Sequence, residues 1–132
     1  MTRAEKLGYR IDFVCVHDYG GGVEAFKNKL TSIHNKFKKP ILVTEFAVAD
    51  WKAGQHGGNK HPVSKVKAFM EQVLPWMEET EWILGYCWFP FGEQSLAGCT
   101  SALFHRSQER GRGQRARQDQ RGLACGARAA FV

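Results

Sequence analysis

Residues 41–48 read ILVTEFAV, an apolar run that is interrupted only by Thr44 and Glu45. A nearly continuous run of this kind is typical of a strand buried in a parallel sheet. An ionised carboxylate near the end of a buried strand is costly to desolvate, so Glu45 indicates chemistry more than packing. The stretch therefore predicts a parallel sheet with an acidic group at the C-terminal end of one strand.

Two similar strand segments flank this one, YRIDFVCVH at 9–17 and WILGYCWFPF at 82–91. Between them lie two stretches with the apolar spacing of amphipathic helices, at 23–37 and from Pro62 to Met77, where Pro75 should kink or restart the second helix. Residues 50–61, rich in Gly, Lys, His and Asn, form a long loop. Strand, helix, strand, helix, strand predicts an α/β fold, and we expect the strands to be covered on both faces.

The alternation of side chains along a strand suggests which residues meet. If the strands are regular, Ile41, Val43 and Glu45 share one face. His17, Glu45, and Tyr86 with Trp88 would then gather at the C-terminal ends of the three strands. A barrel of alternating strands and helices places its active site at that end.

The segments VHDYGG, KPILVTEFAVADW and YCWFPFG, in this order and spacing, resemble the last part of the catalytic core of glycoside hydrolase family 128. That family includes endo-β-1,3-glucanases and fungal cell-wall proteins of the alkali-sensitive-linkage type. The resemblance covers residues 9–104. It implies a (β/α)8 barrel of which this chain holds strands six, seven and eight, and it implies that Glu45 is the catalytic nucleophile.

This resemblance implies a retaining glycosidase acting on β-1,3-glucan, with no cofactor. Such enzymes use two carboxyl groups about 5 to 5.5 Å apart, one of which attacks the anomeric carbon. His17 and Tyr19 are expected to keep Glu45 ionised and correctly turned. An aromatic platform for the sugar rings is expected from four side chains, Trp51, Tyr86, Trp88 and Phe89.

The proton donor of the resembled family follows an Asn on strand four, and this chain has no Asn-Glu dipeptide. Asp18, Asp50 and Glu93 are the nearby substitutes, and no spacing argument places any of them across the bond from Glu45. We therefore expect a C-terminal fragment that is inactive by itself. The alternative is a non-catalytic carbohydrate-binding or cell-wall-associated remnant that keeps the aromatic platform without the acid.

The charge is concentrated at the C-terminus. Residues 1–104 carry 12 Lys and Arg against 11 Asp and Glu, whereas residues 105–132 carry 7 Arg against 2 acidic residues. The sequence thus predicts a partial catalytic core over 1–104 and an Arg/Gly-rich tail over 105–132 that is irregular, disordered or frameshifted. Because the tail has no repeated Arg-Gly-Gly unit, we rank RNA binding low and expect no nucleic-acid partner.

No metal site is expected either. His56 and His61 flank glycines in the loop without a carboxylate or thiol partner in sequence, which favours solvated histidines. The cysteines lack C-x-x-C spacing, which argues against a zinc or redox motif. Cys15 and Cys87 should behave as small buried hydrophobic residues. The sequence does not decide whether Cys87 and Cys99 form a disulfide.

No apolar run is long enough for a membrane span and no secretory signal opens the chain, while full-length relatives are expected to be secreted or cell-wall associated. A three-stranded piece of a barrel also has open edges, through which we expect self-association.

Overall fold

The computed structural model describes residues 2–103 of the 132-residue chain, so the predicted tail at 105–132 lies outside the described residues. The described elements, in chain order, are α1 (Thr2–Lys6), β1 (Val14–Asp18), α2 (Val23–Phe37), β2 (Ile41–Phe46), a short 3₁₀ helix η1 (Ala53–Gln55), α3 (Val63–Glu78), β3 (Ile83–Trp88) and a second 3₁₀ helix η2 (Cys99–Ser101). The predicted alternation of strands and long helices is confirmed.

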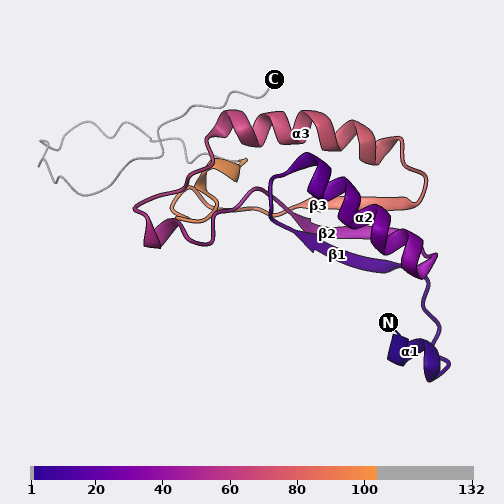
Figure 1. Cartoon of the computed structure of the whole chain (residues 1–132). Coiled ribbons are helices and arrows are strands. Elements are labelled where there is room, and N and C mark those ends of the chain that lie inside the picture. Colours follow the sequence, from indigo (N-terminus) through magenta and orange to yellow (C-terminus); the bar gives the residue numbers. More distant parts are fainter. Residues whose placement is uncertain (1, 104–132) are drawn as a thin grey trace, which may run out of the picture.

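The three strands form one parallel sheet in the order β1-β2-β3. Both long helices lie on the same side of that sheet (Figure 1). The α/β fold class with a parallel sheet is therefore confirmed.

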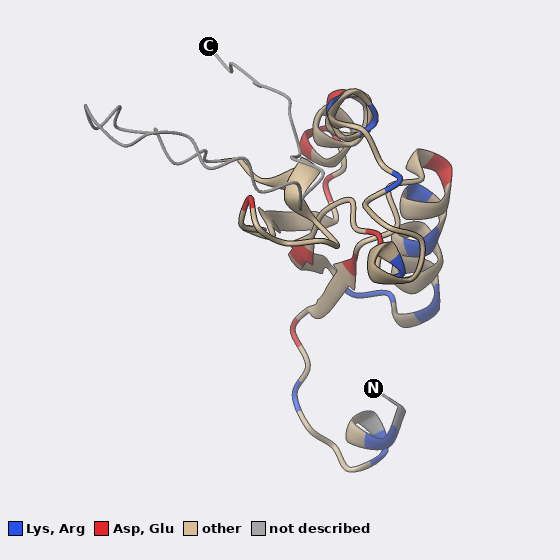
Figure 2. Cartoon of the chain, turned by 90° about the vertical axis from the view of Figure 1, so that its left-hand side faces the viewer, with Lys and Arg blue, Asp and Glu red and all other residues tan. Residues whose placement is uncertain are grey.

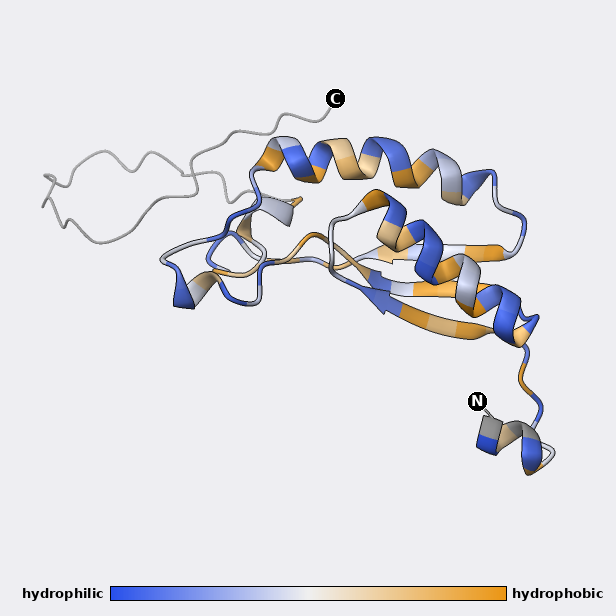
Figure 3. Ribbon diagram, in the orientation of Figure 1, coloured by the Kyte–Doolittle hydropathy of each residue, from blue (hydrophilic) through white to orange (hydrophobic). Residues whose placement is uncertain are grey.

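The core lies between the sheet and the two helices. From α2 come Phe26 and Leu30, and from β2 come Ile41, Val43 and Phe46, all of them essentially inaccessible to solvent. Helix α3 completes the cluster with the set Val66, Phe69, Val73 and Met77. In Figure 3 the strands carry mostly hydrophobic residues, whereas hydrophilic residues lie on the outer surface of the helices. Basic residues are among those on the outside of the helices (Figure 2).

Helix α3 does not restart at Pro75. Pro62 occupies its N-cap, and the helix runs without interruption through Pro75 to Glu78. Helix α2 ends where Lys38 adopts a left-handed conformation with φ 51° and donates its N–H to the carbonyl oxygen of His34, which is a common way to close a helix.

The strands are not regular, and this changes which residues share a face. In the pairing of β2 with β3 the register shifts between Ile41 and Leu42 and again between Val43 and Phe46. In the pairing of β1 with β2 it shifts where Val16 and His17 stand opposite Val43 and Glu45. Both Val43 and Phe46 are fully buried toward the helices, while Glu45 is paired in register with the exposed His17. The expectation that Glu45 shares a face with Ile41 and Val43 is wrong, because the irregularity turns the carboxylate to the opposite face.

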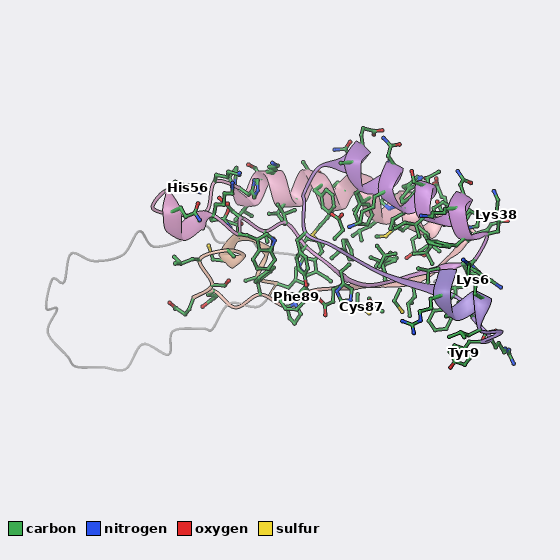
Figure 4. All side chains as sticks on the ribbon, turned by 60° about the horizontal axis from the view of Figure 1, so that its bottom comes forward. Lys6, Tyr9, Lys38, His56, Cys87 and Phe89 are labelled. Carbon is green, nitrogen blue, oxygen red and sulfur yellow. The ribbon has the colours of Figure 1, made fainter. Side chains whose placement is uncertain are left out.

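That opposite face of the sheet is uncovered in the described part of the chain. Phe13 and Leu84 keep 44% and 57% of their surface exposed. Cys15 and Cys87 are also exposed, so the predictions of strands covered on both faces and of buried thiols are wrong. Figure 4 shows Cys87 and Phe89 on the side of the sheet away from the helices.

Among residues 2–103, no helix is both long and apolar enough to cross a membrane.

Candidate active site

Glu45 lies near the C-terminal end of β2 on the uncovered face, and two side chains from the neighbouring segment approach the same carboxylate oxygen. The Tyr19 hydroxyl donates a hydrogen bond to Oε2 of Glu45. The Nδ1 atom of His17 lies 3.4 Å from that oxygen. The predicted grouping of Glu45, His17 and Tyr19 is therefore formed.

The parallel pairing of β1 with β2 makes this meeting possible. His17 stands opposite Glu45 in the register, and Tyr19 follows the end of β1. Beyond the strands the two segments stay joined, since Ala47 and Ala49 donate their N–H groups to the carbonyl oxygens of Asp18 and Tyr19. Backbone pairing on both sides of Glu45 thus fixes the separation of the three side chains.

The site is accessible to solvent, and Tyr19 is a neutral donor in it. The side chains of Glu45 and His17 remain 36% and 53% exposed, so a solute can reach the carboxylate. Burial, together with the hydrogen bond to Glu45 and its negative charge, raises the pKa of Tyr19 to about 12. Tyr19 therefore stays a neutral hydrogen-bond donor to the carboxylate at any physiological pH.

Aromatic rings form one wall beside Glu45. The Tyr19 ring meets Trp51 edge-to-face at a centroid distance of 5.2 Å and Phe89 at 5.5 Å. Phe91 packs on Phe89 at 4.8 Å and on Trp51 at 6.0 Å. Trp51 is 66% exposed, so its ring offers a free apolar surface next to the carboxylate.

Phe91 belongs to this wall as well, and it was not among the predicted site residues. The sequence feature that could have identified Phe91 is its place in the aromatic segment at 82–91, one proline after Phe89. A Cβ atom at Gly98 would lie 2.1 Å from the Phe91 ring, so the absence of a side chain at Gly98 makes room for it.

Tyr86 and Trp88, expected on the face of Glu45, lie on the other face. Both pack against the core cluster between sheet and helices. The Tyr86 hydroxyl donates to Glu78 of α3, which raises the pKa of Tyr86 with help from burial, and Trp88 donates its Nε1–H to the carbonyl oxygen of Ser101 at 2.9 Å. The structure brings Trp51 and Phe89 into contact with Tyr19, the hydrogen-bond partner of Glu45, but it does not bring Tyr86 and Trp88 there.

Two of the three carboxylates considered as substitute acids are engaged elsewhere. Asp18 binds Nζ of Lys29 at 2.8 Å. Asp50 is buried and accepts a hydrogen bond from Nε2 of His56 at 2.8 Å. The hydrogen bonds and ion pairs described for Glu45 come from Tyr19 and His17.

The two loop histidines differ in their surroundings. His61 is buried with only 7% of its surface exposed, so the expectation of a solvated histidine is wrong there. His56 is exposed, as expected, but it has a carboxylate partner in Asp50 that the sequence did not predict. Burial and the nearby charges of Lys65 and Lys60 lower the pKa of His61. No group of three metal-ligating side chains occurs within residues 2–103.

The sequence left a Cys87–Cys99 disulfide undecided. In the part of the chain that the structure describes, Cys87 and Cys99 are not joined by a disulfide.

A family model described as the glycosyl hydrolase catalytic core matches residues 1–112. The chain belongs to this family. A comparison with curated proteins finds no significant match.

Solved structures place this glycosyl hydrolase core among proteins of glycoside hydrolase family 128, which confirms the resemblance drawn from the sequence. A variant of the subgroup I endo-β-1,3-glucanase from Amycolatopsis mediterranei, in complex with laminaritriose and laminaribiose, is 25% identical with a TM-score of 0.57; the match covers 67% of this chain and 38% of that one. A subgroup V exo-β-1,3-glucanase from Cryptococcus neoformans is 26% identical with a TM-score of 0.54, covering 70% of this chain and 37% of that one.

A subgroup VI exo-β-1,3-glucanase from Aureobasidium namibiae matches at 22% identity and a TM-score of 0.63, covering 78% of this chain and 38% of that one, and shares the fold. This chain thus spans well under half the length of these relatives.

Proposed function

We propose that Glu45 is the nucleophile of a retaining glycoside hydrolase site directed at β-1,3-glucan, and that this chain supplies strands six, seven and eight of a (β/α)8 barrel. The observation that carries the proposal is the convergence of Tyr19 and His17 on one oxygen of Glu45. The site sits at the C-terminal ends of parallel strands, where barrels of this type hold their active sites. Relatives bound to laminari-oligosaccharides support the substrate class.

In the proposed reaction, a carboxylate oxygen of Glu45 attacks the anomeric carbon of the bound sugar. The C1–O bond to the departing alcohol breaks, and an ester links the sugar to Glu45 until water hydrolyses it. The hydrogen bond from Tyr19 orients the carboxylate. The exposed ring of Trp51, with Phe89, gives the apolar face of a glucose ring a surface on which to pack.

Release of an ordinary sugar alcohol needs a proton from a second carboxyl group. The engagement of Asp18 with Lys29 and of Asp50 with His56 supports the view that neither supplies it. We therefore propose that this chain alone binds β-1,3-glucan without hydrolysing it at a normal rate. We further propose secretion or cell-wall association for the full-length relatives.

A substrate that needs no proton donor tests the role of Glu45 as nucleophile separately from the lack of a proton donor. 2,4-Dinitrophenolate is a leaving group that departs without protonation, so 2,4-dinitrophenyl β-laminaribioside tests the nucleophile alone. We expect one equivalent of dinitrophenolate per chain, a sugar adduct on the peptide containing Glu45, and no hydrolysis of laminarin.

The matched control is Glu45→Gln, which keeps the size of the side chain and should give neither burst nor adduct. Laminarin hydrolysis by the parent chain that is lost in Glu45→Gln would contradict the proposed inactivity. Oligosaccharide binding with no adduct would instead support the alternative, a non-catalytic carbohydrate-binding protein.

A further inference from the structure

The loop that follows β2 carries a buried carboxylate, Asp50, directly before the exposed ring of Trp51. Asp50 has 3% of its surface exposed to solvent, whereas Trp51 has 66% exposed. A buried carboxylate is costly unless hydrogen bonds compensate it. Its contacts therefore indicate what it holds in place.

Three donors surround the Asp50 carboxylate. Oδ1 accepts the backbone N–H of Lys52 at 3.1 Å. Oδ2 accepts the backbone N–H of Lys60 at 3.1 Å and a hydrogen bond from Nε2 of His56 at 2.8 Å. Although burial alone would raise it, these hydrogen bonds lower the pKa of Asp50 to about 2, so the carboxylate remains charged.

The same segment is tied to the loop that precedes η2. The N–H of Asp50 donates to the carbonyl oxygen of Ala97 at 2.7 Å, and Nδ2 of Asn59 donates to that oxygen at 2.8 Å. Both ends of the 50–60 loop are therefore held at one point. Figure 4 shows His56 at the outer end of this loop.

Trp51 has little packing of its own to fix it. Its described ring contacts are those with Tyr19 and Phe91, while its backbone lies between Asp50 and the Lys52 N–H that Asp50 binds. We infer that Asp50 is a positioning residue that holds Trp51 against Tyr19, and so sets the aromatic wall of the Glu45 site. The sugar-binding consequence rests on the proposed function; the placement of Trp51 does not.

The test labels the four tryptophans with 5-fluorotryptophan and follows them by ¹⁹F NMR, with the Trp51 signal assigned from Trp51→Phe. In Asp50→Ala we expect the Trp51 signal to move, while the signals of Trp76 and Trp82, which pack against the core, stay unchanged. Laminarihexaose affinity should fall about tenfold, as expected when an aromatic anchor is displaced. In a Trp51→Ala background, Asp50→Ala should have no further effect on affinity.

Two other variants keep the inference falsifiable if Asp50→Ala does not fold. His56→Ala removes one donor from a half-exposed position and should move the Trp51 signal in the same direction by a smaller amount. Lys52→Ala is the matched control, because it keeps the backbone N–H that Asp50 binds, and it should move nothing.

An unmoved Trp51 signal in folded Asp50→Ala or His56→Ala would overturn the inference. Equal losses of affinity with and without Trp51 would overturn it as well. If the parent chain binds no laminarihexaose, the proposed function fails, whereas the Trp51 signal in the free chain still decides the role of Asp50.

Discussion

Tyr19 connects the Glu45 carboxylate to the aromatic wall of the candidate site. Its hydroxyl binds Glu45, and its ring meets Trp51 and Phe89. Tyr19→Phe should keep these ring contacts and lose only the hydrogen bond, which contributes about 1 kcal/mol to stability. We expect a rate of glycosyl transfer to Glu45 that is about tenfold lower, because the carboxylate loses its orientation. The dinitrophenolate burst measures it, with Tyr9→Phe, at an exposed tyrosine, as the control.

The same contact predicts how Tyr19 titrates. Its pKa is about 12, against an ordinary value of 10. Burial contributes most to this increase, and the hydrogen bond to Glu45 and the negative charge of Glu45 contribute the rest. Glu45→Gln should lower the pKa of Tyr19 toward 10 without reaching it. Because the folded chain holds the phenol proton longer than the unfolded chain, this contribution to stability is complete below pH 10 and is lost as the pH rises toward 12. The absorbance difference between the parent and Tyr19→Phe follows this ionisation, and an unchanged pKa in Glu45→Gln would contradict the contact.

At the level of single residues, the sequence allowed prediction of what depends on strand order. Glu45, His17 and Tyr19 meet because parallel strands bring their C-terminal ends together. The faces of Tyr86 and Trp88 were not predictable, since an extra residue in β3 between Ile83 and Gly85 reverses the orientation of the side chains that follow it in this strand. The contact between Asp50 and His56 was not predicted either, because a loop has no periodicity from which to infer which side chains meet.

Among the elements, the turn from β1 to α2 depends on Gly21. It has φ 65°, and an added Cβ would lie 2.5 Å from Cγ1 of Val48, on the segment that follows β2. Gly21→Ala should therefore destabilise the fold by about 1 to 3 kcal/mol through strain and overpacking. Thermal or urea unfolding measures this loss. Gly54→Ala is the matched control, because nothing lies near its added Cβ, and an equal loss there would contradict the explanation.

The loop between β2 and α3 should weaken in acid. Asp50 has a pKa of about 2 in the folded chain against an ordinary 3.8. Between these values the unfolded chain binds more protons, so this contribution to stability is complete above about pH 4 and is lost as the pH falls toward 2. Melting temperatures across this range should fall more steeply for the parent than for Asp50→Asn. The lowered pKa of His61 adds a separate loss below pH 6.5 that Asp50→Asn should retain, and parallel curves for both chains between pH 4 and 2 would contradict the role of Asp50.

For the whole molecule, the uncovered face of the sheet predicts self-association in solution. Both long helices cover one face, while Phe13 and Leu84 are exposed on the strands or beside them, and β1 and β3 are edge strands in the described residues. Unpaired strand edges beside an apolar surface favour pairing with another chain. We therefore expect the purified chain to self-associate with rising concentration, as measured by sedimentation equilibrium. Leu84→Lys should shift the equilibrium toward monomer because it places a charge next to the edge, whereas Leu96→Lys, at a residue of similar exposure outside the strands, should not. A parent chain that stays monomeric at all concentrations and melts cooperatively would show that three strands with one open face suffice for a stable unit, and the proposal that they are part of a larger barrel would lose its physical basis.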